Sequence, residues 1–305
     1  MKRNASACPA ARPAAQSAFP DPARHLARQR AANFLLRLLV RLASLLTAGV
    51  LLFLVGYILV MGVPNLKPSL FAWEYNSENV SLVPAAINTL FTIILTLLIC
   101  LPLGIGAAIY LVEYTGRGNR LVGLVRITAE TLSGIPSVVY GFFGMVVLVP
   151  LVRTVFGGDG MSILTASVLL GIMILPTIIT VSRSALDAVP EQYYEGALAL
   201  GASHERSVFT IVLPAAKSGV LAGVILGVGR AIGETMAVIM VAGNQPRVPS
   251  SILEGVRTLT TNIVLEMGYA ADLHREALIA TAVVLFVFIL LINALFAAVK
   301  RRQRI

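Results

Sequence analysis

Six long apolar runs limit what this chain can fold into. They lie at residues 35–63, 84–112, 128–152, 162–182, 215–243 and 277–299. A helix needs roughly 20 mostly apolar residues to cross a bilayer. Charged residues make up only 13% of the chain and hydrophobic residues 57%, whereas soluble domains average about 25% charged residues. The sequence therefore predicts an all-α, polytopic membrane protein with six transmembrane helices.

The first run is too long for the apolar region of a signal peptide, and no small-residue cleavage site follows it. We therefore expect a retained first helix and an external loop over residues 34–83. Residues 1–33 are rich in Ala, Pro and Arg and show no apolar period, which is typical of a disordered cytoplasmic tail. The core of the protein would then span 84–300, with a second short cytoplasmic tail at 301–305.

Lys and Arg residues gather in alternate connections between the runs. They precede the first run, separate the second from the third and follow the last, whereas the loop 64–81 holds one lysine against two glutamates. Cytoplasmic loops of membrane proteins carry an excess of Lys and Arg. Both termini and the loop 184–214 are therefore expected in the cytoplasm, with 244–276 outside and folded back on the bundle. The same rule explains the formal net charge of +9 without nucleic-acid binding.

The loop before the fifth run contains the polar stretch EGALALGASHERSVFTIVLP, residues 195–214. Pro190 suits the first turn of a helix, and Gly201 suits its C-terminal cap. Ser203 would cap a second short helix that leads to Pro214 and the fifth run. The sequence thus predicts a helix–glycine–helix corner at the membrane surface. A partner protein could bind to this corner. The alternative is a capped helical hairpin without a partner.

This corner resembles the EAA loop of ABC-transporter permeases at Glu195, Ala197 and Gly201 and in the closing sequence IVLP, although Gly196 replaces the first alanine. SGIPSVVYG at 133–141 and GRAIGETMAV at 229–238 resemble the phosphate-specific permeases, in the C-type form rather than that of the A-type partner subunit. The likeness covers about residues 84–300. It implies the type I (MetI-like) importer permease fold and a multi-pass position in a bacterial inner membrane.

The resemblance also implies function and partners. The chain would be the permease subunit of an ATP-driven importer of inorganic phosphate, and residues 190–214 would dock on the ATP-binding subunit through Glu195, Ala197 and Gly201. A second permease subunit, more plausibly A-type than identical, would complete the pathway, and a periplasmic phosphate-binding protein would deliver substrate. The chain itself would not be an enzyme, because a separate subunit hydrolyses ATP.

Two charged residues, Arg230 and Glu234, lie midway along the fifth run. A charge at the bilayer centre costs roughly 2.5–3.5 kcal/mol on insertion scales, so such residues usually face protein or water. Their spacing makes them neighbours on a helix. An ideal helix places them within an arc of roughly 80° with Gly219, Gly223 and Gly227, and small residues at this spacing let helices approach closely. We therefore expect the charged pair on the closely packed face of the helix.

The functional interpretation is that Arg230 meets the anion as it crosses, because its planar donors suit phosphate oxygens. Glu234 would balance Arg230 when the pathway is empty. The alternative is a structural ion pair that joins two helices. Ser133 and Ser137 flank a break at Gly134–Pro136; broken helices often line transport pathways, although a packing kink is an equal alternative.

Other polar residues fit structural roles. Asn88 and Thr89 are expected to hydrogen-bond between helices, and Arg257, Glu266 and His274 to form a solvated face outside. The sequence contains no phosphate loop for ATP and no metal or cofactor motif; Cys8 and Cys100 imply no disulfide framework. Three alternatives remain: an importer of sulfate, molybdate or phosphonate, a secondary transporter, and an intramembrane enzyme or signalling subunit, for which no catalytic residues are evident.

Overall fold

The structure is a computed structural model that describes residues 22–76, 79–115 and 120–302. In chain order its helical elements are α1 (Pro22–Gly62), η1 (Val63–Asn65), η2 (Pro68–Phe71), α2 (Val83–Ile109), η3 (Tyr110–Tyr114), α3 (Arg120–Gly134), α4 (Ser137–Phe143), η4 (Gly144–Leu148), α5 (Val149–Phe156), α6 (Ile163–Asp187), α7 (Glu191–Ala199), α8 (His204–Ser207), η5 (Val208–Val212), α9 (Leu213–Gly233), α10 (Met236–Val241), α11 (Leu259–Met267) and α12 (Asp272–Arg302). The chain forms two units, Met1–Tyr57 and Ile58–Ile305.

Within the described residues six helices are long and apolar enough to cross a membrane, as the sequence predicts. They are Asn33–Asn65, Val83–Tyr114, Ser137–Phe156, Ile163–Asp187, His204–Gly233 and His274–Ala298. The first unit is the apolar helix α1 as far as Tyr57. Because α1 begins at Pro22, residues 22–33 are helical here, although the sequence placed them in a disordered tail. Residues 1–21 and 303–305 lie outside the described part of the chain.

The third run is two helices rather than one. We expected it at 128–152, but α3 ends at Gly134 and α4 begins at Ser137, so residues 128–134 belong to α3. Pro136 explains the break, because it lacks an N–H and disfavours helical backbone at the residue before it. The Tyr140 hydroxyl spans the break and donates to the Leu132 carbonyl oxygen at 2.8 Å. The apolar span starts only after the break.

The fifth run also differs from the prediction of one helix over 215–243. The helix starts earlier, at His204, and passes through α8, η5 and α9 to Gly233. Glu234 then has extended backbone, with φ −73° and ψ 120°, and α10 begins at Met236. The Glu234 carboxylate accepts from the Ala237 N–H at 3.3 Å. This bond satisfies one of the N–H groups that a new helix leaves free in its first turn, so the break is stabilised locally.

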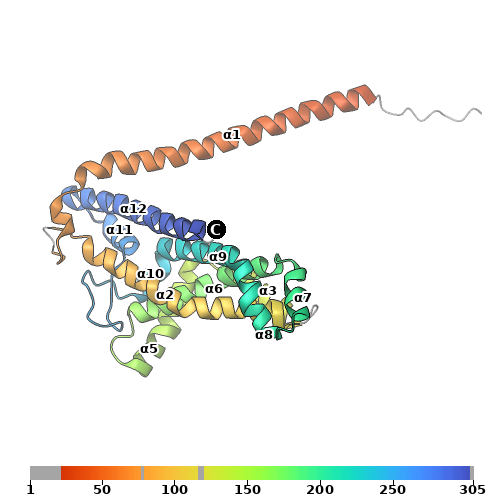
Figure 1. Ribbon diagram of the computed structural model, residues 1–305. Coiled ribbons are helices and arrows are strands. Elements are labelled where there is room, and N and C mark those ends of the chain that lie inside the picture. Colours follow the sequence, from red (N-terminus) through yellow and green to blue (C-terminus); the bar gives the residue numbers. More distant parts are fainter. Residues whose placement is uncertain (1–21, 77–78, 116–119, 303–305) are drawn as a thin grey trace, which may run out of the picture. The chain divides into compact units, whose positions relative to one another are not determined.

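The centre of the second unit is α6, which packs between α2 and α9 (Figure 1). Leu169, Ile174 and Ile178 of α6 are fully buried. The three glycines Gly219, Gly223 and Gly227 face α6: a Cβ atom at Gly219 would overlap Ala185, and one at Gly223 would lie 3.1 Å from the Val181 Cβ. Close approach of the two helices therefore depends on the absence of side chains at these positions.

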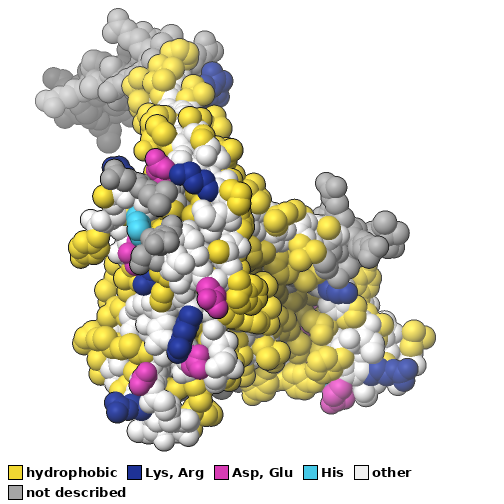
Figure 2. All heavy atoms as spheres, turned by 90° about the vertical axis from the view of Figure 1, so that its left-hand side faces the viewer, with side chains coloured by type: hydrophobic (Ala, Val, Ile, Leu, Met, Phe, Trp, Pro, Cys, Tyr) yellow, Lys and Arg dark blue, Asp and Glu magenta, His cyan; other side chains and the backbone are white. Residues whose placement is uncertain are grey.

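The segment 244–271 folds back against α2, as expected. The Asn88 amide donates to the backbone oxygens of Arg247 and Arg257 at 2.9 and 3.2 Å, and the Thr89 hydroxyl accepts from the Leu259 N–H at 2.9 Å. This segment lies at the opposite end of the helices from α7 and α8 (Figure 1). Figure 2 looks onto this end and shows charged side chains of both signs on it.

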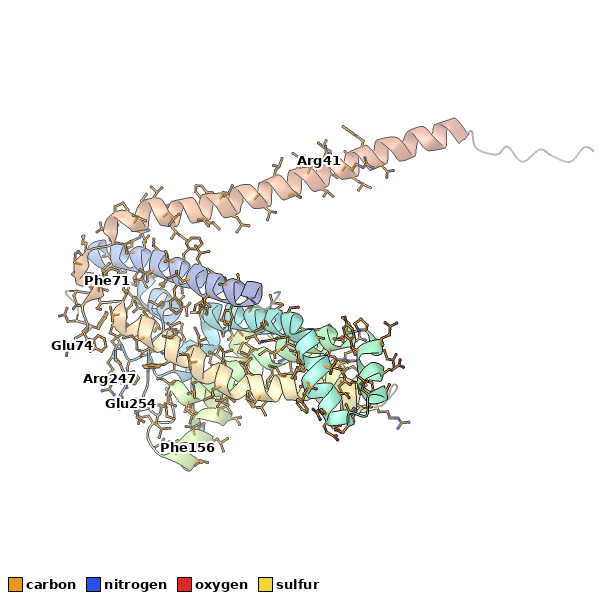
Figure 3. All side chains as sticks on the ribbon, viewed as in Figure 1. Arg41, Phe71, Glu74, Phe156, Arg247 and Glu254 are labelled. Carbon is orange, nitrogen blue, oxygen red and sulfur yellow. The ribbon has the colours of Figure 1, made fainter. Side chains whose placement is uncertain are left out.

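Arg257 is not part of a solvated face, contrary to the sequence-based prediction. Its side chain is 13% exposed and pairs with Glu266 at 2.8 Å. It also donates to the backbone oxygen of Asn244 at 3.1 Å and to the Asn262 side chain at 3.3 Å. By contrast Arg247, paired with Glu254 at 3.7 Å, is 60% exposed, and both point outward in Figure 3. Hydrogen bonds from Ser250 and the charge of Arg247 lower the pKa of Glu254.

Replacing Arg257 is expected to loosen the segment 244–271. Arg257→Gln leaves Glu266 and the Asn244 carbonyl without their donors, and a lost hydrogen bond to a charged group costs about 1.5–3 kcal/mol. Thermal unfolding in detergent and limited proteolysis of 244–271 would measure the effect. The matched change Arg247→Gln breaks an exposed pair, which contributes about 0–1 kcal/mol. Equal effects of the two substitutions would contradict the structural role of Arg257.

Candidate functional site

The polar stretch before α9 forms a compact helical hairpin, which we call the 190–214 hairpin. Pro190 precedes the first residue of α7 and acts as its N-cap, one position before the expected first turn. Gly201 has φ +83°, a conformation that glycine adopts without steric penalty. The Ser203 hydroxyl accepts from the Arg206 N–H at 3.3 Å. The predicted glycine and serine caps are therefore confirmed.

The three residues of the EAA-like sequence differ in exposure. Glu195 and Gly201 are exposed, whereas Ala197 is only 6% exposed. A Cβ atom at Gly196 would meet nothing within 4 Å, so contacts within this chain do not require glycine where the family sequence has alanine. Glu195 and the turn around Gly201 thus remain free for another protein, while Ala197 holds the hairpin together.

Leu200 is a residue that the sequence analysis missed. It lies at the tip of the hairpin, directly before Gly201, and is 92% exposed. Leucine is among the residues most often fully buried, so an exposed leucine at a turn is informative. The sequence signal was available, because Leu200 is an apolar residue next to a capping glycine in a polar loop. Only the structure shows that the Leu200 side chain is exposed, because this depends on the position of α7.

The two helix breaks lie next to each other in the second unit. The half-helices α4 and α10 pack together, and a Cβ atom at Gly141 would lie 3.0 Å from the Ala237 Cα. Ser133 and Ser137 stand on either side of the first break. The exposed Ser133 donates to the Ala129 backbone oxygen at 2.8 Å, and Ser137 is the first residue of α4.

Arg230 and Glu234 do not pair, contrary to the expectation of an adjacent helical pair. Arg230 is half-buried in the last turn of α9, and within the described ranges no hydrogen bond or ion pair reaches it. Glu234 lies beyond the end of the helix, and its carboxylate binds the N–H of Ala237 instead. The buried Ala231, rather than Arg230, continues the line of glycines toward α6. The break at Glu234 is the reason, because the spacing argument assumed an unbroken helix.

The guanidinium of Arg230 lies close enough to the Tyr140 hydroxyl for its charge to act on it. Tyr140 lies one helical turn after Ser137, and residues three apart in sequence share a helix face. Arg230 therefore lies near the first turns of α4, whereas Glu234 lines a small cavity that four threonines share with apolar residues such as Leu170 and Val238. Among the residues that the structure describes, no cluster of His, Cys, Asp and Glu could hold a metal ion.

Known proteins share this architecture. Residues 100–305 match the family described as the binding-protein-dependent transport system inner membrane component. A probable ABC transporter permease protein, YqgH of Bacillus subtilis, is 40% identical over 209 residues, 66% of this chain and 67% of the relative. The phosphate transport system permease protein PstC of Mesorhizobium japonicum is 34% identical over 246 residues, 73% of this chain and 74% of the relative.

Solved structures show the same fold. A bacterial ABC transporter involved in the import of alginate aligns with a TM-score of 0.59 at 18% identity, over 90% of this chain and 99% of that chain. The MetNI methionine ABC transporter gives 0.53 at 19% identity, over 73% and 94%. The fold and apolar helices define a multi-pass ABC importer permease of the bacterial inner membrane, a transport subunit and not an enzyme. The chain belongs to the binding-protein-dependent transport system inner membrane component family.

Proposed function

We propose that this chain is the permease subunit of an ATP-driven importer of inorganic phosphate. Several relatives that are 32–37% identical are named phosphate transport system permeases. The structural observation that carries the proposal is the unpaired, half-buried guanidinium of Arg230. A phosphate ion offers the charge and the oxygen acceptors that the guanidinium lacks within the described chain. A related oxyanion, namely sulfate, molybdate or phosphonate, is the alternative substrate.

The surroundings of Arg230 suit an anion. Its fork of donors can bind two phosphate oxygens at once. The first turn of α4, which opens the apolar span Ser137–Phe156, carries the partial positive charge of a helix start. Broken helices in transporters often direct such ends at anionic substrates. Ser133 and Ser137 add hydroxyl groups on both sides of the break. The Glu234 carboxylate contributes by accepting a hydrogen bond from the first turn of α10. Its negative charge is used there and does not neutralise Arg230.

The orientation that we propose places the 190–214 hairpin in the cytoplasm. Lys and Arg gather before the first apolar run and after the last, and further basic residues lie at this end of the helices: Arg120, Arg126, Arg183, Arg206 and Lys217. With both termini on the same side as the hairpin, this distribution follows the charge rule for cytoplasmic loops, and the segment 244–271 would be outside. Both chain termini would then be cytoplasmic. The outer face would receive a periplasmic phosphate-binding protein, and the hairpin would dock on the ATP-binding subunit.

The proposed mechanism uses the continuity of the fifth helix. ATP binding closes the pair of ATP-binding subunits and moves the docked hairpins, and rigid elements convert this movement into rocking of the permease helices. Because His204–Gly233 is one helix, movement of its cytoplasmic end reaches Arg230 directly. At about 1.5 Å per residue, Arg230 lies roughly 40 Å along this helix from His204. A second permease subunit, which we propose to be a related A-type chain, would close the other side of the pathway.

The docking role is tested by changing the tip of the hairpin in the transporter reconstituted with its ATP-binding subunit, second permease and binding protein. Leu200→Asp places a charge where we expect an apolar contact, and a lost interface anchor weakens association about 30-fold or more. Glu195→Ala is expected to lower transport-linked ATP hydrolysis. Co-purification of the ATP-binding subunit and ATP-dependent uptake of labelled phosphate would be measured. Tyr269→Asp, at a position 91% exposed at the opposite end, is the matched control for added charge.

Each outcome of this experiment has a clear meaning. Normal assembly and uptake with both hairpin variants would refute docking through the hairpin. Uptake of sulfate or molybdate but not phosphate would refute the substrate while leaving the class of transporter intact. Phosphate uptake by the permease in the absence of the ATP-binding subunit would indicate a secondary transporter.

A further inference from the structure

Three aromatic side chains join the hairpin to the end of α2. The Tyr194 hydroxyl of α7 forms a 2.7 Å hydrogen bond with Nδ1 of His204, the first residue of α8. The His204 ring also stands edge-on to Tyr114 of η3, with ring centroids 4.8 Å apart and an interplanar angle of 79°. His204 therefore contacts two other elements at once. We call Tyr114, Tyr194 and His204 the aromatic joint.

The joint borders a cavity of about 880 Å³ between the hairpin and the ends of α2 and α6. Charged groups from three elements line it: Glu113 of η3, Arg183 and Asp187 of α6, and Glu191 of α7. Across this cavity the described residues of α7 and of the ends of α2 and α6 are not closely packed, and close packing is what makes protein interiors rigid. The position of α7 on this side therefore depends on a few individual contacts, among which the joint is prominent.

The start of the fifth helix is held mainly by apolar packing. Val208 and Val212 of η5 are buried with Ala108 and Ile109 of α2 and with Leu186 of α6. This apolar cluster fixes the start of the fifth helix on the bundle. The parts of the hairpin are thus held differently: η5 is buried in the apolar cluster, and α7 is held by its turn, by the buried Ala197 and by Tyr194, which packs at the edge of the cluster and bonds to His204.

We propose that His204 is a positioning residue for energy coupling. It holds α7 at a fixed angle to α8 and to the end of α2, so that movement imposed on α7 by the ATP-binding subunit is transmitted to α2 and to the fifth helix. Without the joint, α7 tilts into the cavity and part of the movement is lost. The inference rests on the proposed docking of the 190–214 hairpin and assigns a role to residues other than the matched positions Glu195, Ala197, Gly201 and IVLP.

The test compares transport with ATP hydrolysis in the complete reconstituted transporter. Tyr194→Phe removes one oxygen atom and keeps the ring, and His204→Ala removes the joint. Both variants are expected to keep assembly and the ATP hydrolysis rate while the phosphate transported per ATP falls about three- to tenfold, within the range by which single residues modulate coupling. His204→Asn keeps a hydrogen-bonding group near the Nδ1 position and is expected to recover part of the ratio. Tyr269→Phe is the control for loss of an exposed hydroxyl.

A double variant separates the joint from two independent effects. If Tyr194 acts through His204, Tyr194→Phe combined with His204→Ala loses no more coupling than His204→Ala alone. A normal ratio of phosphate transported per ATP in Tyr194→Phe would overturn the inference even if His204→Ala failed to assemble. Additive losses in the double variant would also overturn it. The docking proposal is judged separately by Leu200→Asp, whose readout is co-purification. Failure of docking and failure of the joint therefore give different results.

Discussion

Arg230→Gln is expected to abolish most ATP-dependent phosphate uptake while leaving assembly and basal ATP hydrolysis intact. The guanidinium has no hydrogen-bonding or ion-pairing partner in the described part of the chain, so its removal leaves no orphaned carboxylate and the fold should tolerate it. A hydrogen bond to a charged group contributes about 1.5–3 kcal/mol, which predicts a loss of roughly ten- to hundredfold in uptake for one or more such bonds. Labelled phosphate uptake into liposomes would measure it.

Two further variants sharpen this prediction. Arg230→Lys keeps the charge but loses the planar fork, so we expect an intermediate rate because a lysine cannot bind two oxygens in that geometry. Lys217→Gln removes an exposed charge from the same helix and should transport normally. Uptake by Arg230→Gln equal to that of the unchanged protein would remove Arg230 from the pathway.

Glu234→Gln distinguishes the two interpretations of the charged residues. If Glu234 were the counterion of Arg230, its neutralisation would disturb uptake as strongly as Arg230→Gln. In the structure its carboxylate accepts from the Ala237 N–H, and a glutamine side-chain oxygen can accept the same bond. We therefore expect Glu234→Gln to transport within about threefold of the unchanged protein, because the neutral bond is weaker but still formed.

Gly219→Ala is expected to destabilise the protein at the contact of α9 with α6. The added Cβ atom would overlap the Cβ atom of Ala185 in α6. The alanine side chain ends at this atom, so it has no flexible part that could move away. Overpacking of a close contact costs typically about 1–3 kcal/mol. Since α6 is the central helix, the strain spreads to its contact with α2. Thermal unfolding of the purified chain in detergent would show a lower midpoint.

The same helix supplies a matched control. A Cβ atom at Gly229 would meet nothing within 4 Å, and alanine is favoured over glycine in helices by about 1 kcal/mol. Gly229→Ala should therefore leave the unfolding temperature unchanged or raise it. If Gly219→Ala and Gly229→Ala behaved alike, the close approach of α6 and α9 would not depend on the absence of a side chain at Gly219.

Much of the fold could be predicted from sequence because its signals are local. Each apolar run is long enough to define a spanning helix by itself. The helix caps at Gly201 and Ser203 could also be predicted from residue type alone, because a cap involves only the backbone of the next few residues. The EAA-like sequence was recognised in the same way, from spacing within one loop.

The candidate site was less predictable because it depends on where helices break. The glycine spacing correctly indicated a face that approaches another helix. It also implied that Arg230 and Glu234 continue that face, and this inference was wrong because α9 ends at Gly233. Gly233 is a weaker signal for this break than Pro136 is for the first, because glycine is also tolerated inside membrane helices. The burial of Arg257 was missed for a related reason, since its partner Glu266 lies on another element.

The sequence by itself determined the membrane class, the number of spanning helices and the shape of the hairpin, because each depends on the hydrophobicity or backbone preference of consecutive residues. Only the tertiary structure decided that Arg230 stands without an ion-pair partner among the described residues, that the Arg257 side chain is largely shielded from solvent and that His204 joins α7 to the end of α2. These properties depend on distances between side chains far apart in the chain. Packing of whole helices sets such distances, and no local spacing rule contains them.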